Sequence, residues 1–594
     1  QKNITISGYI YDKESHETLI SANIFDIVSQ QGAASNNFGF YSLSVPPGAI
    51  KLRPSYVGYN SDEVSVTANS DTVIHFFLKP SPLLQEIVVE GKRNDITHQA
   101  EIGKISLNSA TIRSIPSFMG ENDVIKALQQ MPGVSAGTEG IAGMYVRGGN
   151  ADENLYLVDG NPLYHINHLV GLFSTFNPEA VKTMDFYKGS FPARYGGRLS
   201  SVVDVRMNDG NMKNFNGSIS VGLISSRATF EGPIVKDKTS FTISLRRTYL
   251  DLLTRPLMYF TNKKEKKENP ETYETIDAGY YFYDFNAKIT HRFSDKSRLF
   301  LSLYDGKDKL FMHNHNRLYS EYNLDHYDNP AKSNFKTHLE KTEDDVNFNM
   351  GWGTRMASLN WTYTISNTLF SNATLVYSRY ASDIALKTDM RRNLTIREKE
   401  SDMLFSANTK VLSKTTYGSG IEDIGYRVEF DYMPVNNHFI RFGSSLLHHT
   451  FRPEESRILL SQENNSERRK DTVNFANERV KVKELSLYAE DEIDFGKRLK
   501  INAGVHFSGF FVQGKSYISA QPRLSARYLL SDNWSLKASY GKMNQYVHLL
   551  QSSYISLPND LWVPITKNIK PMVSHQVSTG IFGRYGRFDV SLET

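Results

Sequence analysis

The chain has 594 residues, with 68 basic and 64 acidic side chains and a formal net charge of +4. This length exceeds one ordinary compact domain of about 100–200 residues, and so small a net charge gives no basic field that would attract nucleic acid. The absence of cysteine excludes structural disulfides, thiolate metal sites and a cysteine nucleophile.

Residues 3–79 contain short β-prone runs separated by turn signals. Apolar and polar residues alternate around Ile4 and Ile6, and Pro46-Pro47-Gly48 marks a tight turn. Strands at this spacing predict a small β-sandwich over residues 1–80. Residues 81–114 predict a polar linker that holds one isolated apolar patch, LLQEIVVEG.

Residues 115–212 predict a compact α+β domain of about 100 residues. Apolar residues at helical spacing in GENDVIKALQQMPGV predict a helix that ends before Pro132-Gly133. FNPEAVKTMDF predicts a second short helix, with Asn177 as its N-cap and Pro178 at its first position. NLYLVDG and SSVVDVRM predict strands of the same domain.

Residues 213–594 predict a transmembrane antiparallel β-barrel without helices. The strands alternate with period two, as where Leu524 and Ala526 alternate with Arg523 and Ser525. Aromatic residues make up 12% of the chain although its mean hydropathy is −0.42. Barrel strands have this composition, because they turn apolar side chains to lipid and polar ones to the lumen.

The connections between these strands fall into two classes. Very short turns are predicted at residues 235–239, 293–296, 365–368, 434–438, 495–498, 530–533 and 584–587. Long polar loops are predicted at residues 251–278, 309–349, 381–418, 453–482 and 549–572. Tight turns at one end of a sheet and long loops at the other are typical of an outer-membrane barrel.

Several segments, in their order along the chain, resemble one known family. The opening GYIYDKESHETLISANIFDI and NNFGFYSLSVPPGAIKLRPSYVGY are similar to a carboxypeptidase-regulatory domain, and LLQEIVVEG is similar to a Ton box. IKALQQMPGV, YVRGGNADENLYLVDGNPLY and FNPEAVKTMDFYKGSFPARYGGRLSSVVDVRM are similar to a plug domain, and LWVPITKNIKPMVSHQVSTGIF to a late barrel segment. Together they resemble TonB-dependent outer-membrane transporters with an N-terminal carboxypeptidase-regulatory-like domain.

The resemblance implies a mainly β fold in which a small α+β plug fills a 22-stranded barrel. We count about fifteen strands in this sequence, so we expect about seven C-terminal strands to lie outside it. A barrel cannot remain open in lipid, because its edge strands would leave backbone groups unpaired.

The implied function is active uptake of a nutrient across the outer membrane of a Gram-negative bacterium, with the N-terminal domain in the periplasm. The nutrient would be a glycan, a peptide, a siderophore or a cofactor. The implied partners are TonB of the TonB–ExbB–ExbD system, outer-membrane lipids and, in some relatives, a surface lipoprotein. We expect no enzyme activity, no bound cofactor and no nucleic-acid partner.

The segment between sandwich and plug is the expected coupling site. A short β-prone strip in a linker can add a strand to the sheet edge of a partner. The alternative is a last strand of the sandwich or plain linker. The residues assigned to this Ton box are Leu84, Gln85, Glu86, Ile87, Val88, Val89 and Glu90.

The stretch MYVRGGNADENLYLVDGNPLY has the glycines of a phosphate-binding loop without its context. A phosphate loop leads into a helix, whereas Gly148-Gly149 leads into another predicted strand. The resemblance implies structural roles instead, with Arg147 pairing with carboxylates of the barrel wall. The implied plug anchors are Arg147, Gly148, Gly149, Asp159, Gly160, Arg194, Gly196, Gly197 and Arg198.

Several histidine pairs suggest metal binding only weakly. They are His165 with His168, His313 with His315 near His326, and His448 with His449. Metal sites need converging ligands with a supporting shell, and neither cysteine nor an H-E-x-x-H helix is present. We therefore predict no metal site, and keep His165 and His168 as substrate-facing candidates at the plug apex.

Two other functions compete with uptake. A barrel that does not transport, and serves as a structural or assembly partner in an outer-membrane complex, would keep the fold without the coupling. Signalling to an anti-sigma factor through the N-terminal domain usually goes with a different extra domain.

Overall fold

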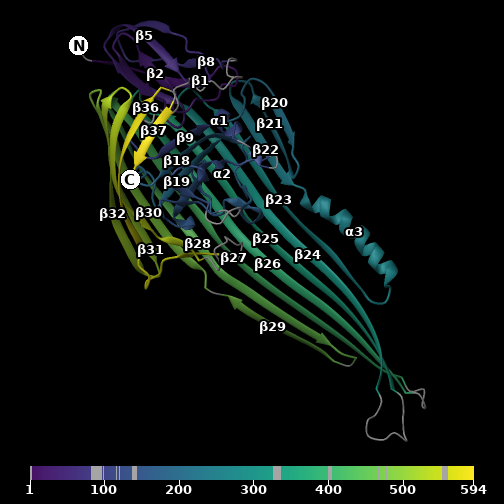
Figure 1. The fold of residues 1–594 in the computed structure, drawn as a ribbon. Helices are drawn as coiled ribbons and strands as arrows, with labels where there is room; N and C mark the ends of the chain where they lie inside the picture. Colours follow the sequence, from purple (N-terminus) through teal and green to yellow (C-terminus); the bar gives the residue numbers. More distant parts are fainter. Residues whose placement is uncertain are drawn as a thin grey trace.

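The computed structural model describes residues 3–81, 97, 99–115, 117–118, 121–136, 143–324, 336–398, 404–465, 467–476, 478–550, 560–586 and 588–594. Figure 1 shows the N-terminal sandwich over one end of a large curved sheet, with the plug elements enclosed by that sheet. The predicted Ton box, residues 84–90, lies outside the described residues.

The N-terminal sandwich consists of two four-stranded sheets around one apolar core. One sheet holds β1 (Ile4–Asp12), β4 (Phe40–Val45), β7 (Thr72–Val73) and β8 (Phe76–Leu78), and the other holds β2 (Asn23–Asp26), β3 (Gln31–Ala34), β5 (Gly48–Ser55) and β6 (Val64–Ala68). Both sheets contribute to the core, which includes Ile6, Ile10, Ile24, Leu43 and Leu52. The alternation in the sequence predicted this arrangement because every other side chain of a strand faces the same side.

The plug is built on a five-stranded sheet in the order β15-β14-β19-β18-β9. Its elements are β9 (Lys104–Asn108), α1 (Ser109–Arg113), β10 (Ser117–Phe118), β11 (Glu121–Asn122), α2 (Val124–Gln129), β12 (Val134–Ser135), β13 (Tyr145–Val146), η2 (Ala151–Glu153), β14 (Asn154–Val158), β15 (Asn161–Pro162), β16 (Asn167–His168), η3 (Leu169–Gly171), β17 (Phe173–Ser174), β18 (Val181–Lys188) and β19 (Ser201–Met207). The predicted helix before Pro132 is confirmed as α2, which Asp123 caps by accepting from the Lys126 amide.

The second predicted plug helix is wrong. Residues 178–180 form one turn, closed by a hydrogen bond from the Ala180 amide to the Asn177 carbonyl, and β18 begins at Val181. The Asn-Pro pair does start a turn, but Val181 and Met184 pack into the plug core as strand residues. Tertiary packing therefore overrides a start signal that carries little energy by itself.

The large sheet has sixteen antiparallel strands in chain order, with β29 paired to β28 beside the main path. They are β20 (Asn216–Val221), β21 (Ser225–Val235), β22 (Thr239–Thr248), β23 (Tyr273–Arg292), β24 (Ser297–Leu324), β25 (Lys336–Thr364), β26 (Leu369–Glu398), β27 (Leu404–Val435), β28 (His438–Glu463), β29 (Arg468–Ala476), β30 (Val480–Phe495), β31 (Leu499–Val512), β32 (Lys515–Ser531), β33 (Trp534–Gln545), β36 (Met572–Tyr585) and β37 (Phe588–Glu593). A separate pair, β34 (Val547–Leu550) and β35 (Leu561–Pro564), lies between β33 and β36 in the chain.

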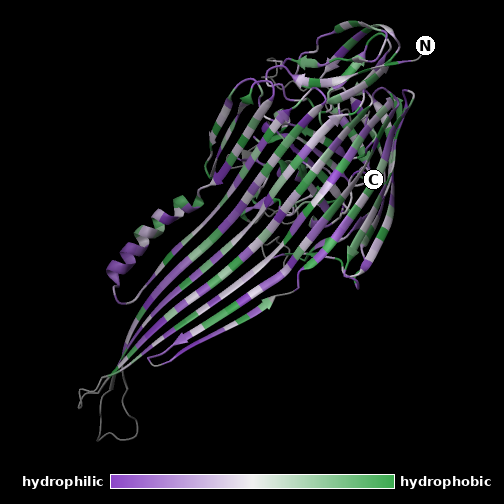
Figure 2. Cartoon of the chain, turned by 180° about the vertical axis from the view of Figure 1, so that it is seen from behind, coloured by the Kyte–Doolittle hydropathy of each residue, from purple (hydrophilic) through white to green (hydrophobic). Residues whose placement is uncertain are grey.

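All seven predicted short turns fall where one strand of this sheet ends and the next begins. Apolar and polar residues alternate along the strands (Figure 2). The alternation is inverted relative to a soluble core: Leu524 is 47% exposed, while its neighbour Arg523 is 5% exposed and faces the plug side. Exposed apolar and buried polar positions are what a barrel in lipid requires.

Three of the predicted long loops are largely strand. Residues 309–349 and 381–418 continue β24 to β27, and residues 453–482 hold the end of β28 together with β29. The pairing of β24 with β25 runs without a break from Ser297↔Tyr363 to Leu324↔Lys336. The far ends carry many polar residues, and apolar residues such as Leu318 and Leu386 are exposed there, so hydrophobic alternation gives no clear strand signal.

The prediction that no helix follows residue 213 is also wrong, because α3 spans Leu250–Glu268. Its second half contains the run NKKEKKE, which we predicted as a solvated loop. Lysine and glutamate favour helices, and Lys264 pairs with Glu268 one turn on at 3.8 Å. Within the described ranges, no helix is long and apolar enough to cross a membrane.

Candidate functional site

A hollow lies between the plug, the segment that holds β34 and β35, and Tyr380 of the sheet; its space of about 680 Å³ includes open solvent. Aromatic side chains from both sides line it. Tyr164 meets Trp562 of β35 edge to face, with ring centres 5.1 Å apart, and His165 stacks on Tyr380 of β26 at 5.6 Å. The hollow therefore offers flat apolar walls to a ligand.

Charged groups of both signs line the same hollow. Arg198 is 8% exposed and its guanidinium lies 5.5 Å from the Trp562 ring. Its Nη1 donates to the Gly197 carbonyl at 2.8 Å, whereas its buried Nε has no hydrogen-bond partner among the described residues. Asp152 and Asp560 place two carboxylates in the lining. A buried donor without a partner is costly, so Arg198 is ready to bind an acceptor.

Asp152 is held in place by the barrel side. Its carboxylate accepts from the Leu549 amide and from Gln545 Nε2, both at 3.2 Å. Burial raises the pKa of this carboxyl, but the hydrogen bonds from His548 and the Leu549 amide outweigh burial and hold the pKa below its ordinary value. Asp152 is therefore charged at neutral pH.

His168 is clamped between two carboxylates of the barrel wall. Nδ1 lies 2.6 Å from Asp308 Oδ2 and Nε2 lies 2.9 Å from Asp284 Oδ1, and all three side chains are at most 1% exposed. The imidazole also stacks on Phe282, with ring centres 4.0 Å apart and planes within 1°. We expected His168 to face a substrate; both of its ring nitrogens face the wall instead.

A wider polar network surrounds this clamp, here named the His168 cluster and made up of His168, Asp284, Asp308, Arg246, Tyr280 and Tyr304. Arg246 Nε donates to Asp284 Oδ2 at 2.8 Å, and the Tyr304 hydroxyl donates to Asp284 Oδ1 at 2.8 Å. Tyr280 donates to Asp308 and accepts from the Leu169 amide at 2.7 Å. The cluster joins the plug to β22, β23 and β24.

The plug-side histidines differ in charge. Burial lowers the pKa of His168, but Asp284 and Asp308 outweigh burial and raise it to about 9. Burial also lowers the pKa of His165, to about 4, and the carboxylate of Asp308 only partly offsets this. At neutral pH His168 is therefore an imidazolium that pairs with the two wall carboxylates. His165 is a neutral ring in the lining of the hollow.

Plug stability should consequently fall at alkaline pH. The pKa of His168 in the folded state, about 9, lies above the ordinary value of about 6.5. Its stabilising effect is complete below about pH 6.5 and is lost as pH rises through about 9. We expect the unfolding midpoint of the plug to decline between pH 7 and pH 10, measured by differential scanning calorimetry of the purified protein. Glutamine cannot be protonated, so the unfolding midpoint of His168→Gln should fall less between pH 7 and pH 10. An identical fall in the variant would contradict the role given to the His168 charge.

A second buried network ties the same plug segment to other strands. The Tyr164 hydroxyl donates to Asp423 Oδ2 of β27 at 2.5 Å. His449 of β28 bridges Asp423 Oδ1 at 2.7 Å and Glu484 Oε2 of β30 at 3.2 Å. Plug residues 164–168 are thus bonded to strands on two parts of the wall.

Three of the predicted plug anchors bond to the sheet. Arg147 donates to Ser578 Oγ and Glu593 Oε2, both at 2.8 Å. Asp159 accepts from Ser302 Oγ at 2.8 Å and pairs with Lys288 at 3.4 Å. Arg194 pairs with Glu490 at 2.5 Å. The fourth charged anchor, Arg198, lines the hollow instead.

The predicted glycines lie at tight places in the plug. Gly148, Gly160 and Gly197 have φ of +80°, +83° and +77°, a region that side chains disfavour. A Cβ on Gly149 would lie 2.6 Å from Ser200 Oγ, and one on Gly196 would collide with the His506 ring. A side chain at these positions would strain the backbone or collide with a neighbour, as the structural interpretation of the motif predicts.

The described histidines of the other predicted pairs lie apart from one another or in ion pairs. His315 pairs with Asp345 at 2.8 Å on the far part of the sheet, and His449 belongs to the buried network above. In the part of the chain that the structure describes, no group of three or more histidine or acidic residues is placed to hold a metal ion. His326 lies outside the described residues.

The wall partners of the plug were missed in the sequence. Asp284, Asp308, Glu490 and Arg523 are buried, inward-facing ionisable residues of the wall strands. A signal was present: an ionisable residue within a membrane strand must face the lumen and find a partner there. Arg523 shows the result, since its Nη1 donates to three plug carbonyls, those of Phe191, Pro192 and Tyr195.

A curved sheet with an apolar outside, a polar inside and a bonded plug defines a plugged outer-membrane barrel. The chain matches the TonB-dependent receptor-like β-barrel over residues 303–593, the TonB-dependent receptor plug domain over 105–203 and the carboxypeptidase-regulatory-like domain over 6–89. The chain belongs to the TonB-dependent receptor family.

Individual relatives are distant. A TonB-dependent receptor of Formosa agariphila is 29% identical over 197 residues, which cover 30% of this chain and 17% of that protein. The chain thus aligns with less than a fifth of the length of this relative. The siderophore receptor PirA of Acinetobacter baumannii is 10% identical, covering 83% of this chain and 94% of that one, with a TM-score of 0.28. A mutant ferric enterobactin receptor PfeA of Pseudomonas aeruginosa, solved with enterobactin, is 10% identical over 83% and 99%, with a TM-score of 0.27.

Proposed function

We propose that this chain imports a small solute across the outer membrane of a Gram-negative bacterium, driven by TonB through residues 84–90. The observation that carries the proposal is the plug itself, which is bonded across the lumen and carries an aromatic hollow between itself and the barrel wall. Solute enters this hollow from the side of the long strand extensions. Pulling on the segment before the plug then breaks plug–wall bonds and opens a path.

The lining of the hollow favours a peptide among the four solute classes. A peptide carboxylate fits the Arg198 Nε–H, its ammonium group fits the carboxylate of Asp560, and its side chains fit the aromatic walls. An anionic siderophore would be repelled by Asp152 and Asp560. A neutral glycan would form no ion pair with Arg198 or with the two carboxylates of the lining. A surface lipoprotein partner stays a prediction.

Proline substitution in the Ton box tests the coupling. In the Ile87→Pro/Val88→Pro variant the segment loses one amide donor at each position and cannot pair as a strand with TonB. We expect energy-dependent uptake to fall at least ten-fold while the amount of protein in the membrane is unchanged. Asn94→Pro, in the same linker but outside the Ton box, is the matched control. Uptake unchanged by the double proline would favour a barrel that serves as a structural or assembly partner.

A further inference from the structure

The sandwich domain is seated on the short-turn end of the large sheet (Figure 1). It contacts the wall in or near four successive short turns. The contacts are His16 with Asp237 at 3.1 Å, the Tyr11 hydroxyl with Arg298, the Tyr9 hydroxyl with Thr364 at 2.8 Å, and Asn36 with Asp431 at 2.8 Å. The sandwich therefore covers the mouth of the barrel along β21 to β28.

The centre of this contact is dry and aromatic. Tyr9, Tyr11 and Phe40 of the sandwich pack with Phe370 and Met433 of the wall in one buried cluster. The guanidinium of Arg298 lies 4.0 Å from the Tyr9 ring centre and 5.0 Å from that of Tyr11. Buried aromatic and cation–π contacts are what a specific interface uses, in contrast to a loosely tethered domain.

The sandwich also holds the segment that joins plug to barrel. Glu17 Oε1 accepts from the Asp209 amide at 2.6 Å and from the Gly210 amide at 2.8 Å. The Met212 amide donates to the Ser15 carbonyl at 2.8 Å. Plug, wall and sandwich thus meet at one place.

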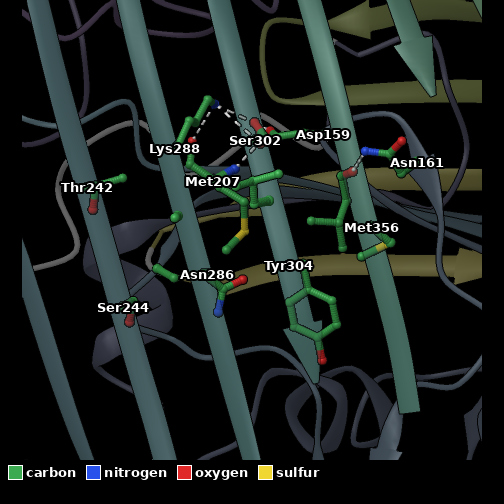
Figure 3. Close-up of a pocket in the computed structure, with 14 residues that line it drawn as sticks. Asp159, Asn161, Met207, Thr242, Ser244, Asn286, Lys288, Ser302, Tyr304 and Met356 are labelled. Carbon is green, nitrogen blue, oxygen red and sulfur yellow. Dashed lines mark hydrogen bonds and ion pairs between the residues drawn. The ribbon is translucent and has the colours of Figure 1, made fainter. Parts of the chain in front are cut away.

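Two cavities lie in sequence between plug and wall at that place. The first is drawn in Figure 3, and the second shares Asp159, Met207, Lys288 and Ser302 with it; each is small and partly open to solvent. Between them Lys288 bridges Asp159 at 3.4 Å and Asp209 at 2.8 Å. The second cavity ends on four sandwich residues, Thr18, Ile20, Asn37 and Phe38.

We infer that this seam along β22 to β25 is the exit route of the solute and that the sandwich is its gate. The inference rests on the proposed uptake function. Residues 84–90 lie in sequence between the last sandwich strand, β8, and the first plug strand, β9. A pull on residues 84–90 applies force to both the sandwich and the plug. The force that loosens the plug therefore also lifts the sandwich from the short turns and opens the second cavity.

Cysteine accessibility tests the gate without any knowledge of the solute, because the chain contains no cysteine. Thr364→Cys places a thiol beneath Tyr9, and Asn360→Cys places one in the second cavity. Val28→Cys, at a sandwich position that is 62% exposed, is the control. Cells are treated with a small hydrophilic maleimide, with and without a proton uncoupler. We expect both buried thiols to react at least five-fold faster in energised cells with TonB, and Val28→Cys to react equally in all.

Equal labelling of Thr364→Cys and Asn360→Cys in energised and uncoupled cells, whether fast or absent, overturns the gate. A cross-link gives a second measurement: Ser7 Oγ and Asn367 Oδ1 are 3.1 Å apart, so the Ser7→Cys/Asn367→Cys pair joins sandwich to wall. Oxidation should reduce uptake at least ten-fold and reductant should restore it. Asn23→Cys/Ala34→Cys, across β2 and β3 within the sandwich, should have no effect.

The two proposals fail in different ways. If uptake is unchanged when the Ser7→Cys/Asn367→Cys cross-link has formed, the gate is overturned. The transport function still stands in that case, provided that uptake depends on Ile87 and Val88. Uptake that is unchanged in the Ile87→Pro/Val88→Pro variant overturns the transport function itself.

Discussion

The Asp284→Ala variant should lose about 3–5 kcal/mol of plug-to-barrel stability, the largest structural effect we expect of a single substitution. Asp284 is fully buried and is the counter-charge of both Arg246 and His168. Its removal leaves two cations without a shared partner in a dry interface. Truncating one member of a buried charged network costs more than the network contributes as a whole, because the remaining charges stay desolvated.

Urea unfolding of the purified protein, followed by trypsin cleavage within the plug, measures this loss. Asp305→Ala is the matched control on the neighbouring strand β24, since Asp305 pairs with Arg355 at 3.2 Å where both side chains are solvent-accessible. Such pairs contribute about 0–1 kcal/mol. If trypsin cleaves the plug of Asp284→Ala at the same urea concentration as the plug of Asp305→Ala, the His168 cluster does not hold the plug.

Arg147→Ala should have a smaller effect than Asp284→Ala. Arg147 and Glu593 are 23% and 22% exposed, so water can replace part of their interaction. The sequence singled out Arg147 because it stands in a recognisable plug motif. The His168 cluster is more deeply buried than Arg147, which the sequence does not show, so we expect it to contribute more to plug stability.

Local patterns in the sequence predicted the features that depend on a few neighbouring residues. The seven short turns follow from turn-forming residues between alternating runs, and α2 follows from apolar spacing before Pro132-Gly133. The errors arose where a longer-range effect decides. Residues 178–180 would begin a helix in isolation, but the plug core takes Val181 and Met184 as strand residues.

The strand extensions and α3 were missed for a different reason. Beyond the membrane both faces of β24 to β28 meet water, so hydrophobic alternation disappears although backbone pairing continues. In α3 the polar composition of a lysine-rich run predicts a loop, although its residues favour helix. Polarity indicates exposure to water and does not by itself indicate irregular structure.

The candidate site could be predicted only in part, because its two sides are far apart in the chain. The plug side, with Arg147, His165 and Arg198, stands in motifs that the sequence shows. Its partners follow hundreds of residues later: Glu593 lies 446 positions after Arg147. Inward-facing charges such as Asp284 within YYFYDFNA identify which wall residues need a partner, but only the register of the sheet determines which plug residue provides it.

The Arg198→Met variant should abolish most peptide uptake while the plug stays in place. Methionine keeps the length and the contact with Trp562 but removes the charge and the Nε–H donor that has no partner among the described residues. A hydrogen bond from a charged group to a ligand carboxylate contributes about 1.5–3 kcal/mol, which corresponds to roughly ten-fold to 150-fold weaker binding. Cells given a mixture of tryptic peptides, with depletion from the medium followed by mass spectrometry, would show this loss.

Arg198→Lys separates charge from geometry in the same assay. Lysine restores the positive charge but not the Nε–H donor of a planar guanidinium, so its uptake should lie between that of the unsubstituted protein and that of Arg198→Met. Arg255→Met is the matched control, because Arg255 lies on α3 and pairs with Asp277 at an exposed position away from the hollow. Wild-type cells that leave the peptides in the medium but deplete a glycan mixture would contradict the peptide assignment. In that case the aromatic walls, and not Arg198, would be the part of the hollow that selects the solute.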